Sequence, residues 1–212
     1  MRAEALIMMS PLQEAGLNPI VYGSISRGDV TANSDVDVFV STISSSFMLE
    51  HILENAGLKP LRRLLIQATP KYAVKGYIYI DERRSFSFPL TNMRIHERQF
   101  YSFGGELSLD GLKEGKRILG VNKSLNLIEP VEDGHIEDTI LGREEEVATL
   151  LRIDVRTVRD RTRALSRRSR IGRTGVFLTR ELSSDETFEQ VLKRLSDRIP
   201  AVRRKIRNDG GL

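Results

Sequence analysis

The 212-residue chain contains no cysteine and no tryptophan, and aromatic residues make up only 6% of it. The lack of cysteine excludes disulfides and thiolate metal sites, which fits a protein of a reducing cytoplasm. No apolar run is long enough to span a membrane, and the first residues lack the basic and apolar regions of a signal peptide. We therefore expect a cytoplasmic protein without a membrane partner.

The net charge of +4 is unevenly distributed along the chain. Residues 143–212 contain 18 Lys and Arg against 11 Asp and Glu, whereas the preceding residues contain 15 against 18. Such an asymmetry divides a chain into parts with different partners, and a basic part favours a polyanion. We predict two domains, residues 1–142 and residues 143–212.

The most informative stretch lies between residues 20 and 40. Residues 20–22 are β-formers that lead into Gly23-Ser24, where a backbone without a side chain can approach a phosphate closely. Further on, Asp35 and Asp37 alternate with valines, so both carboxylates share one face of a strand. Two carboxylates this close repel each other unless a cation neutralises them, and their hard oxygens suit Mg²⁺.

This stretch resembles the DNA polymerase β-like nucleotidyltransferase superfamily, whose signature is Gly-Gly or Gly-Ser followed by Asp-x-Asp on a strand. The small prokaryotic members carry Gly-Ser-x-x-Arg-Gly and Ser-Asp-x-Asp, here Gly23, Ser24, Arg27, Gly28, Ser34, Asp35 and Asp37. The resemblance implies an α/β (α+β) polymerase β-like domain, a mixed sheet with flanking helices. The alternative is an ordinary strand–turn–strand with a surface Asp-x-Asp.

The resemblance also implies roles for these residues. Gly23 and Ser24, with Arg27 and Ser34, would bind the triphosphate of an NTP. The two aspartates would bind catalytic Mg²⁺ in a two-metal site.

Two-metal phosphoryl transfer usually uses a third carboxylate. The chain predicts a hairpin of strands 77–81 and 85–88, a layout similar to that of archaeal tRNA CCA-adding enzymes, whose corresponding strand holds the third acid. Here that strand offers Ser85 and Ser87 instead. The candidate third ligand is Asp81 at the hairpin tip, and the alternative is that Asp81 is a turn residue.

The two phenylalanines of the second hairpin strand, Phe86 and Phe88, alternate with the serines. If the phenylalanines pack into the core, Ser85 and Ser87 face the aspartate site. We take Ser87 as the position where relatives carry their acid.

Residues 144–151 and 156–165, joined by a short turn, fit a helix-turn-helix. The apolar residues at its packing positions are Val147, Ala148, Leu151, Ile153, Val155 and Val158. A glycine turn and a short strand follow and would suit a wing, which predicts a small winged-helix-like domain. The alternative is a plain helical hairpin that packs on the catalytic domain.

Residues 156–173 contain eight arginines and one acid. Arg156, Arg159 and Arg163 share one helix face. Arginine matches phosphate geometry, so we predict that these three bind nucleic acid. The alternative is a solvated basic helix.

Together these patterns predict Mg²⁺-dependent transfer of a nucleoside monophosphate from an NTP to a hydroxyl, with release of pyrophosphate. The acceptor could be RNA, a protein tyrosine or serine, or a small molecule. A protein acceptor stays open because small relatives include antitoxins that modify a partner toxin. The alternative function is a DNA-binding regulator whose nucleotidyltransferase fold has lost activity and senses a nucleotide.

Overall fold

The computed structural model describes residues 1–172 and 174–208. Contacts within the chain divide it into two compact units. Unit 1 consists of Met1–Leu6, Ile20–Ser34 and Ile95–Gly175, and unit 2 consists of Ile7–Pro19, Asp35–Arg94 and Val176–Leu212.

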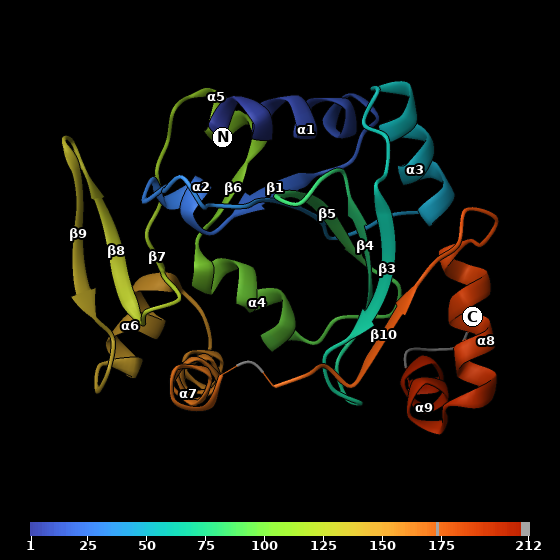
Figure 1. The fold of residues 1–212 in the computed structure, drawn as a ribbon. Helices are drawn as coiled ribbons and strands as arrows, with labels where there is room; N and C mark the ends of the chain where they lie inside the picture. The colour runs from blue at the N-terminus through green and yellow to red at the C-terminus, as the bar shows by residue number, and fades with distance from the viewer. Residues whose placement is uncertain (173, 209–212) are drawn as a thin grey trace. The chain divides into compact units, whose positions relative to one another are not determined.

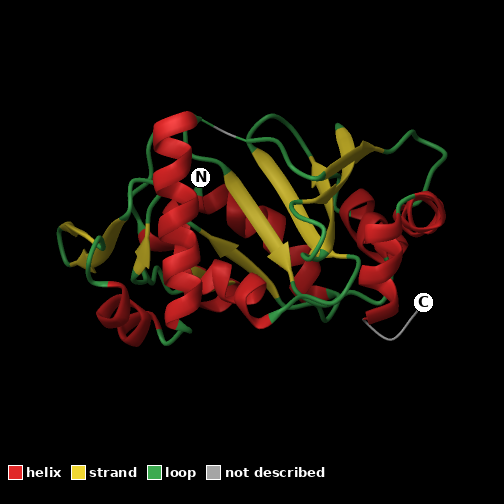
Figure 2. Cartoon of the chain, turned by 90° about the horizontal axis from the view of Figure 1, so that it is seen from below, coloured by secondary structure: helices red, strands yellow, loops and turns green. Residues whose placement is uncertain are grey.

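Unit 2 is built on a mixed sheet (Figures 1 and 2). Its strands are β2 (Val36–Val40), β3 (Arg62–Gln67), β4 (Val74–Tyr79), β5 (Arg84–Pro89) and β10 (Leu178–Glu181). They lie in the order β10-β3-β4-β5-β2, with β2 parallel to β5 and the other pairs antiparallel. The predicted hairpin is thus confirmed as β4 and β5.

Helices α3 (Ser46–Asn55) and α8 (Phe188–Arg198) cover one face of this sheet. The Phe88 ring of β5 meets the Phe188 ring of α8 edge-on, with centroids 5.1 Å apart. The Arg63 guanidinium of β3 pairs with Glu50 of α3 at 2.7 Å. Alternation along the strands places Val36, Val38, Val40, Ile78, Phe86 and Phe88 on this face, and all of them are buried.

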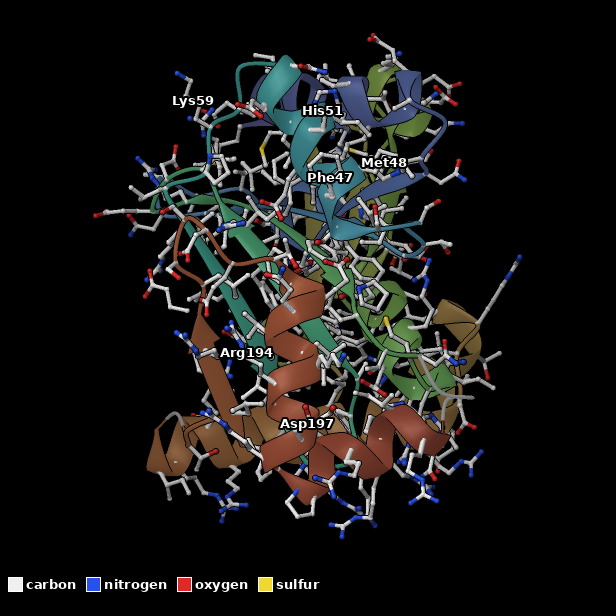
Figure 3. The ribbon with its side chains drawn as sticks, turned by 90° about the vertical axis from the view of Figure 1, so that its right-hand side faces the viewer. Phe47, Met48, His51, Lys59, Arg194 and Asp197 are labelled. Carbon is white, nitrogen blue, oxygen red and sulfur yellow. The ribbon has the colours of Figure 1, made fainter. Side chains whose placement is uncertain are left out.

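The ends of these helices follow local signals in the sequence. The Ser45 hydroxyl caps α3 by accepting from the Met48 N–H, and Gly57 follows its end with a left-handed φ of 72°. The last helical region breaks at Pro200, which begins α9 (Pro200–Asn208). On the outside of α3, the exposed Phe47 ring stacks on His51 (Figure 3).

Unit 1 contains the antiparallel pair β1 (Pro19–Tyr22) and β6 (Glu106–Ser108). Its helices include α2 (Ser24–Arg27), α4 (Ile95–Gly104) and α5 (Leu109–Lys113). Helix α1 (Arg2–Glu14) begins in unit 1 and continues in unit 2.

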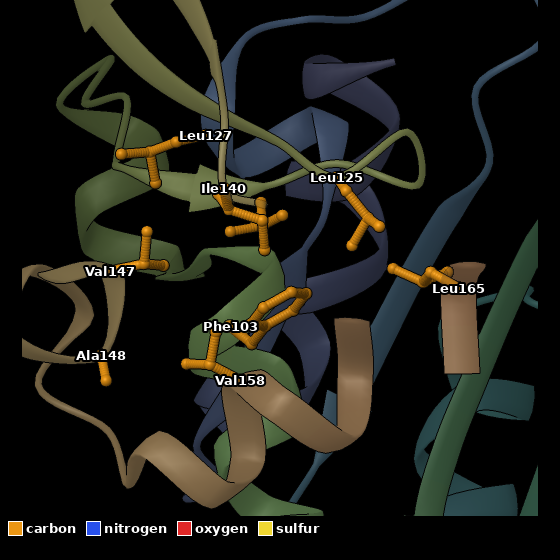
Figure 4. Packing of buried hydrophobic residues seen from close by; sticks show 9 residues of the cluster. Phe103, Leu125, Leu127, Ile140, Val147, Ala148, Val158 and Leu165 are labelled. Atoms are coloured by element: carbon orange, nitrogen blue, oxygen red, sulfur yellow. The ribbon is translucent and has the colours of Figure 1, made fainter. Parts of the chain in front are cut away.

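The rest of unit 1 is a small antiparallel sheet with two helices. The sheet has the order β7 (Gly120–Val121), β8 (Asn126–Val131), β9 (Gly134–Thr139), and the helices are α6 (Glu144–Leu151) and α7 (Val155–Ile171). They share one apolar cluster with α4 (Figure 4): Phe103, Val121, Leu125, Leu127, Ile140, Val147, Ala148, Val158 and Leu165. Leu151, Ile153 and Val155 pack against it, so the predicted packing positions of the helix pair are confirmed.

The predicted wing is not found where the sequence placed it. The strand after α7 is β10, which pairs with β3 in the sheet of unit 2, as Leu178 opposite Gln67 and Glu181 opposite Leu64 show (Figure 1). It is therefore not a wing of the α6–α7 pair. Which strand a short strand pairs with depends on residues elsewhere in the chain, and its own residues do not specify it.

The units also differ from the predicted domains, residues 1–142 and 143–212. Residues 143–175 belong to unit 1, where α7 packs with α4, and residues 176–212 belong to unit 2. The charge asymmetry thus does not coincide with the division that the contacts give. None of the described helices has the length and apolar character that crossing a membrane requires.

Candidate active site

In unit 1 the glycine loop joins β1 to the short helix α2. Gly23 has φ 81° and ψ −143°, a conformation that residues with a Cβ rarely adopt. No atom lies within 4 Å of where a Cβ on Gly23 would stand, so backbone geometry and not crowding requires the glycine. Ser24 follows as the first residue of α2, and its Oγ donates to Ser34 Oγ at 3.1 Å. Both serines of the predicted nucleotide site are thus in contact.

The glycine loop is held by the backbone that follows α4. Gly23 N donates to Gly105 O at 3.0 Å. Ser26 Oγ lies 2.7 Å from Gly23 O and 2.6 Å from Gly105 O. Gly120 packs on the same backbone, because a Cβ there would stand 2.6 Å from Gly105 N. Residues 104–105 and 120 therefore form a support under the loop that the sequence motif does not reveal.

The side chain of Arg27 points toward this supporting backbone. The side chain is buried, and its guanidinium donates to Gly104 O and pairs with Asp29 Oδ2 at 2.9 Å. A buried arginine is retained only with such partners. These contacts favour a role in holding the loop, and the predicted contact of Arg27 with a phosphate stays a prediction.

The two aspartates lie in unit 2, at and just before β2. Asp35 is exposed and Asp37 is half-buried, whereas Val36 and Val38 between and after them are buried on the other face. Burial raises the pKa of Tyr79, and the negative charges of Asp37 and then Asp35 raise it further, against a lowering by Arg62. Both carboxylates thus act on the same ring, which fits the predicted common face.

The serine strand lies directly beside the aspartates. In the parallel β2–β5 pair, Asp37 stands opposite Ser85 and Phe39 opposite Ser87. The Ser85 hydroxyl donates to Asp37 Oδ1 at 2.6 Å. The expectation that the serine face adjoins the aspartates is confirmed for Ser85. In this register Ser85 and not Ser87 stands beside Asp37, and the choice of Ser87 as the position of an acid in relatives stays a prediction.

Asp81, the candidate third metal ligand, is engaged in the hairpin turn. Its Oδ1 accepts from Arg83 N at 2.9 Å and Arg84 N at 2.8 Å, and its Oδ2 accepts from Arg84 Nε at 2.6 Å. The backbone N–H of Arg83 contributes most to lowering the pKa of Asp81. These contacts favour the turn role. The metal role of Asp81 stays a prediction that no contact supports.

The donor set fits one magnesium ion better than two. Among the described residues, no group of three or more His, Asp or Glu is arranged to hold a metal. Mg²⁺ is commonly bound by one or two carboxylates together with water and substrate phosphates. Asp35 and Asp37 meet that requirement for one ion, whereas the neighbour of Asp37 on β5 is the uncharged Ser85.

Sequence reasoning missed three residues that share the aspartate face. Tyr79 stands opposite Ser85 on β4, Tyr77 stands opposite Ser87, and Arg62 of β3 stands opposite Tyr79. The pKa of Tyr77 is raised to about 12, first by burial and then by Tyr79 and Asp37. The only signal was the alternation of Tyr77 and Tyr79 along a strand, which by itself does not say which face carries the site.

The three arginines predicted to bind nucleic acid all lie on α7 and are exposed. Each has an acidic neighbour: Arg156 pairs with Asp154, Arg159 with Glu145, and Arg163 lies 3.8 Å from Asp160. Arg161 instead turns inward, with its guanidinium 4.7 Å from the centre of the Phe100 ring. The eighth arginine of the segment, Arg173, lies outside the described residues.

Comparison with known families supports the interpretation of the N-terminal motif. Residues 12–89 match the model of the family described as the nucleotidyltransferase domain. No curated protein and no solved structure shows a significant match. The matched segment contains Gly23, Ser24, Asp35, Asp37 and Ser85. Residues 12–89 are thus similar to a nucleotidyltransferase domain, and the mixed sheet with flanking helices is consistent with that fold.

Proposed function

We propose that this protein transfers a nucleoside monophosphate from an NTP to an acceptor hydroxyl in a Mg²⁺-dependent reaction. The observation that supports this most strongly is the Asp35/Asp37 pair on one strand face, within the segment that matches the nucleotidyltransferase domain. The acceptor oxygen bonds to the α-phosphorus, the bond between this phosphorus and the oxygen that bridges to the β-phosphate breaks, and pyrophosphate leaves. The proton of the acceptor hydroxyl passes to solvent.

The residues of the chain have distinct parts in this reaction. Asp35 and Asp37 hold the metal, which when bound neutralises charge on the reacting phosphates. Gly23, whose N–H is engaged by Gly105 O, offers the triphosphate a backbone without a side chain, and Ser24 binds it through its N–H and hydroxyl at the start of α2. Ser34 orients the Ser24 hydroxyl, and Arg27 keeps the loop in place. Ser85 orients Asp37 by its hydrogen bond but adds no charge.

Transfer is tested with an NTP labelled at the α-phosphate, incubated with Mg²⁺ and in turn with RNA, with a total protein fraction and with small alcohols. We expect the label on one acceptor class and an equal amount of pyrophosphate. Release of inorganic phosphate instead, with no labelled acceptor, would show an NTP hydrolase and contradict the proposal. EDTA should stop the reaction.

We expect the Ser85→Asp variant to bind Mg²⁺ more tightly than the wild type and to depend on it more strongly for stability. Without metal, a third carboxylate beside Asp37 adds repulsion between like charges. With Mg²⁺ bound, the same carboxylate is an additional charged ligand. The Mg²⁺ concentration for half-maximal activity should fall on the order of tenfold. The rise of Tm with added Mg²⁺ should also exceed that of wild type.

Ser85→Ala is the matched control for this variant, because it removes the hydroxyl and adds no charge. Ser87→Asp, one row away opposite Phe39, should change the magnesium titration less. Equal titrations of Ser85→Asp and Ser85→Ala would show that this position does not adjoin the metal.

A second candidate function is a DNA-binding regulator with an inactive nucleotide-sensing domain. Two observations favour it: Ser85 stands where an acid would complete the site, and α7 presents arginines along one exposed face. Arg167 and Arg170 continue the face of Arg163, and among the described residues no acid pairs with either of them. In this function the protein binds NTP and DNA but transfers nothing.

Salt dependence tests the nucleic-acid contact of α7. If Arg156, Arg159 and Arg163 meet phosphates, log K against log salt has a slope near roughly −0.9 per phosphate contacted. The triple alanine variant should flatten that slope, while Lys193→Ala on α8 should leave it unchanged. Should the full-length protein bind neither duplex DNA nor RNA at low salt, α7 has no such partner.

A further inference from the structure

Strand β9 forms the open edge of the small sheet of unit 1 (Figure 1). The strand order is β7-β8-β9, and in the part of the chain that the structure describes no strand pairs with the outer side of β9. All residues of β9 from His135 to Thr139 are exposed. Such an edge presents backbone N–H and C=O groups with which a further strand can pair.

The register shows which backbone groups of β9 point outward. Ile140 N donates to Leu125 O at 2.9 Å, in the same register as the β8–β9 ladder. Because hydrogen-bonded pairs alternate with non-hydrogen-bonded pairs along an antiparallel ladder, every second residue of β9 bonds to β8. Pro130, which has no N–H, occupies a position of β8 that does not bond to β9. The residues of β9 whose N–H and C=O groups point away from β8 are His135, Glu137 and Thr139.

The hairpin of β8 and β9 is held at both ends. The Arg117 guanidinium donates to three carbonyls of the turn, those of Val131, Glu132 and Gly134. At the other end, the Asn122 side chain accepts from the backbone N–H groups of Ser124 and Asn126 at 2.9 and 3.0 Å. A strand that is ordered before it binds loses little conformational freedom on binding.

The same hairpin is strongly acidic. Residues 126–139 contain no Lys or Arg and five acids: Glu129, Glu132, Asp133, Glu137 and Asp138. An imidazole and a guanidinium pair with the last two, and among the described residues no cation pairs with the other three. A second copy of β9 would bring five more acids against these five, and like charges on paired strands are destabilising. The charge therefore fits a basic strand and disfavours pairing of β9 with itself.

The two faces of β9 differ, which sets the side-chain pattern of a partner strand. His135 and Glu137 lie on one face, whereas Ile136 lies on the other. That other face also carries Leu127 of β8, which packs into the apolar cluster of unit 1. Ile136 remains 56% exposed. A strand beside β9 thus fits best with a basic residue next to Glu137 and an apolar residue next to Ile136.

We propose that the outer edge of β9 is a docking site for an extended segment of a partner protein, in which basic and apolar residues alternate. The segment adds to the sheet as a fourth strand. Main-chain hydrogen bonds to His135, Glu137 and Thr139 supply the pairing, and the acids and Ile136 select the side chains. The inference stands apart from the proposed nucleotidyl transfer, because the hairpin contributes none of the proposed ligands.

Peptide binding tests the site on the full-length protein without nucleotide. The probes are fluorescently labelled decapeptides in which Lys or Arg alternates with Val or Ile, and a Glu-Val decapeptide is the control for charge. In the proposed pairing the basic residues direct their N–H groups toward β9. Methylation of the Lys backbone nitrogens should therefore weaken binding at least about tenfold more than methylation of the Val backbone nitrogens, at equal charge.

Amide exchange locates the bound strand. With a saturating concentration of the Lys-Val peptide, we expect exchange to slow on the order of tenfold or more at the outward amides, those of His135, Glu137 and Thr139. The amides of Ile136 and Asp138 donate to β8 already and should slow less. Slowing confined to helices or to other strands would overturn the assignment to β9.

Two substitutions of Glu137 separate strand pairing from charge. Glu137→Gln keeps the outward N–H and loses the charge, and we expect about twofold to fivefold weaker binding. Glu137→Pro loses both, while Ile136 and Asp138 still donate to β8, and it should bind at least about tenfold more weakly than wild type. Equal binding by the two variants would show a contact made by charge alone. Thermal melts check folding, and if Glu137→Pro does not fold, the methylated peptides and wild-type amide exchange decide.

Two further outcomes would overturn the proposal. If none of the basic peptides binds, β9 is an edge that its charges protect from pairing. If the wild type associates with itself and the same outward amides become protected without peptide, the edge belongs to a second copy of the chain.

Discussion

Replacement of Asp37 by Asn is expected to lower nucleotidyl transfer at least a hundredfold, by roughly 3 kcal/mol of transition-state stabilisation or more. The substitution removes one of the two carboxylates that we propose bind the metal and preserves the shape of the side chain. The amide oxygen of the new side chain can still accept the Ser85 hydroxyl, which in wild type lies 2.6 Å from Asp37 Oδ1. The fold should therefore survive, and the loss should come from the charge alone.

Three measurements check this expectation. The α-labelled NTP assay should show the loss of transfer for Asp37→Asn and for Asp35→Asn. Thermal melts without metal should show no loss of stability, because the variants relieve the repulsion between two neighbouring carboxylates. The increase of Tm with Mg²⁺ should shrink in both variants. Asp197→Asn is the control, an exposed acid on α8 (Figure 3). Wild-type turnover in either site variant would remove the assigned metal site.

The elements that the sequence predicted are those with local signals. Alternation along residues 36–40 and 84–89 was sufficient to separate the buried valines and phenylalanines from the aspartates and serines. The helix pair α6–α7 was predictable because its apolar spacing marks one packing face. Arg152 takes the left-handed conformation in its turn, φ 54°, where glycine is usual, so the departure from the pattern did not prevent the turn.

The missed features depend on which strands become neighbours. Tyr79 and Arg62 join the aspartate face only through the register of β5, β4 and β3, which spans more than twenty positions of sequence. Alternation likewise gives the common face of Ser85 and Ser87 but not which of them stands opposite Asp37. The strand expected as a wing is β10, which pairs with β3 about 110 positions away in the chain. Such pairings follow from burial of whole faces, which a short window of residues does not specify.

Arg27 illustrates the limit of inferring roles from a motif. Its place beside Gly23-Ser24 suggests contact with the phosphates, yet its guanidinium donates to the carbonyl of Gly104 and pairs with Asp29. Gly104 lies 77 positions further along the chain, whereas Asp29 is only two positions away. The glycine loop and its support are therefore one structural feature, although only the loop belongs to the sequence motif.

Gly120→Ala is expected to lower the stability of the fold strongly while it leaves all proposed ligands in place. The new Cβ would stand 2.6 Å from Gly105 N, 2.7 Å from Gly104 C and 2.8 Å from Gly104 O. All three are backbone atoms, so no side-chain rotation relieves the overlap. Overpacking of this kind costs about 2 kcal/mol or more. For a chain of this length we expect a decrease in Tm of roughly 5 °C or more.

The same displacement should weaken nucleotide binding, because Gly105 O accepts the Gly23 N–H and lies against Ser26 Oγ. Gly175→Ala is the matched control, since no atom lies within 4 Å of its Cβ position and its φ is not left-handed. Gly115→Ala measures the cost of backbone strain alone, because its Cβ position has open space but its φ of 72° is left-handed. Melting curves and titrations with a fluorescent NTP analogue would measure both effects. A Gly120→Ala protein with wild-type Tm and nucleotide affinity would show that the 104–105 backbone does not hold the glycine loop.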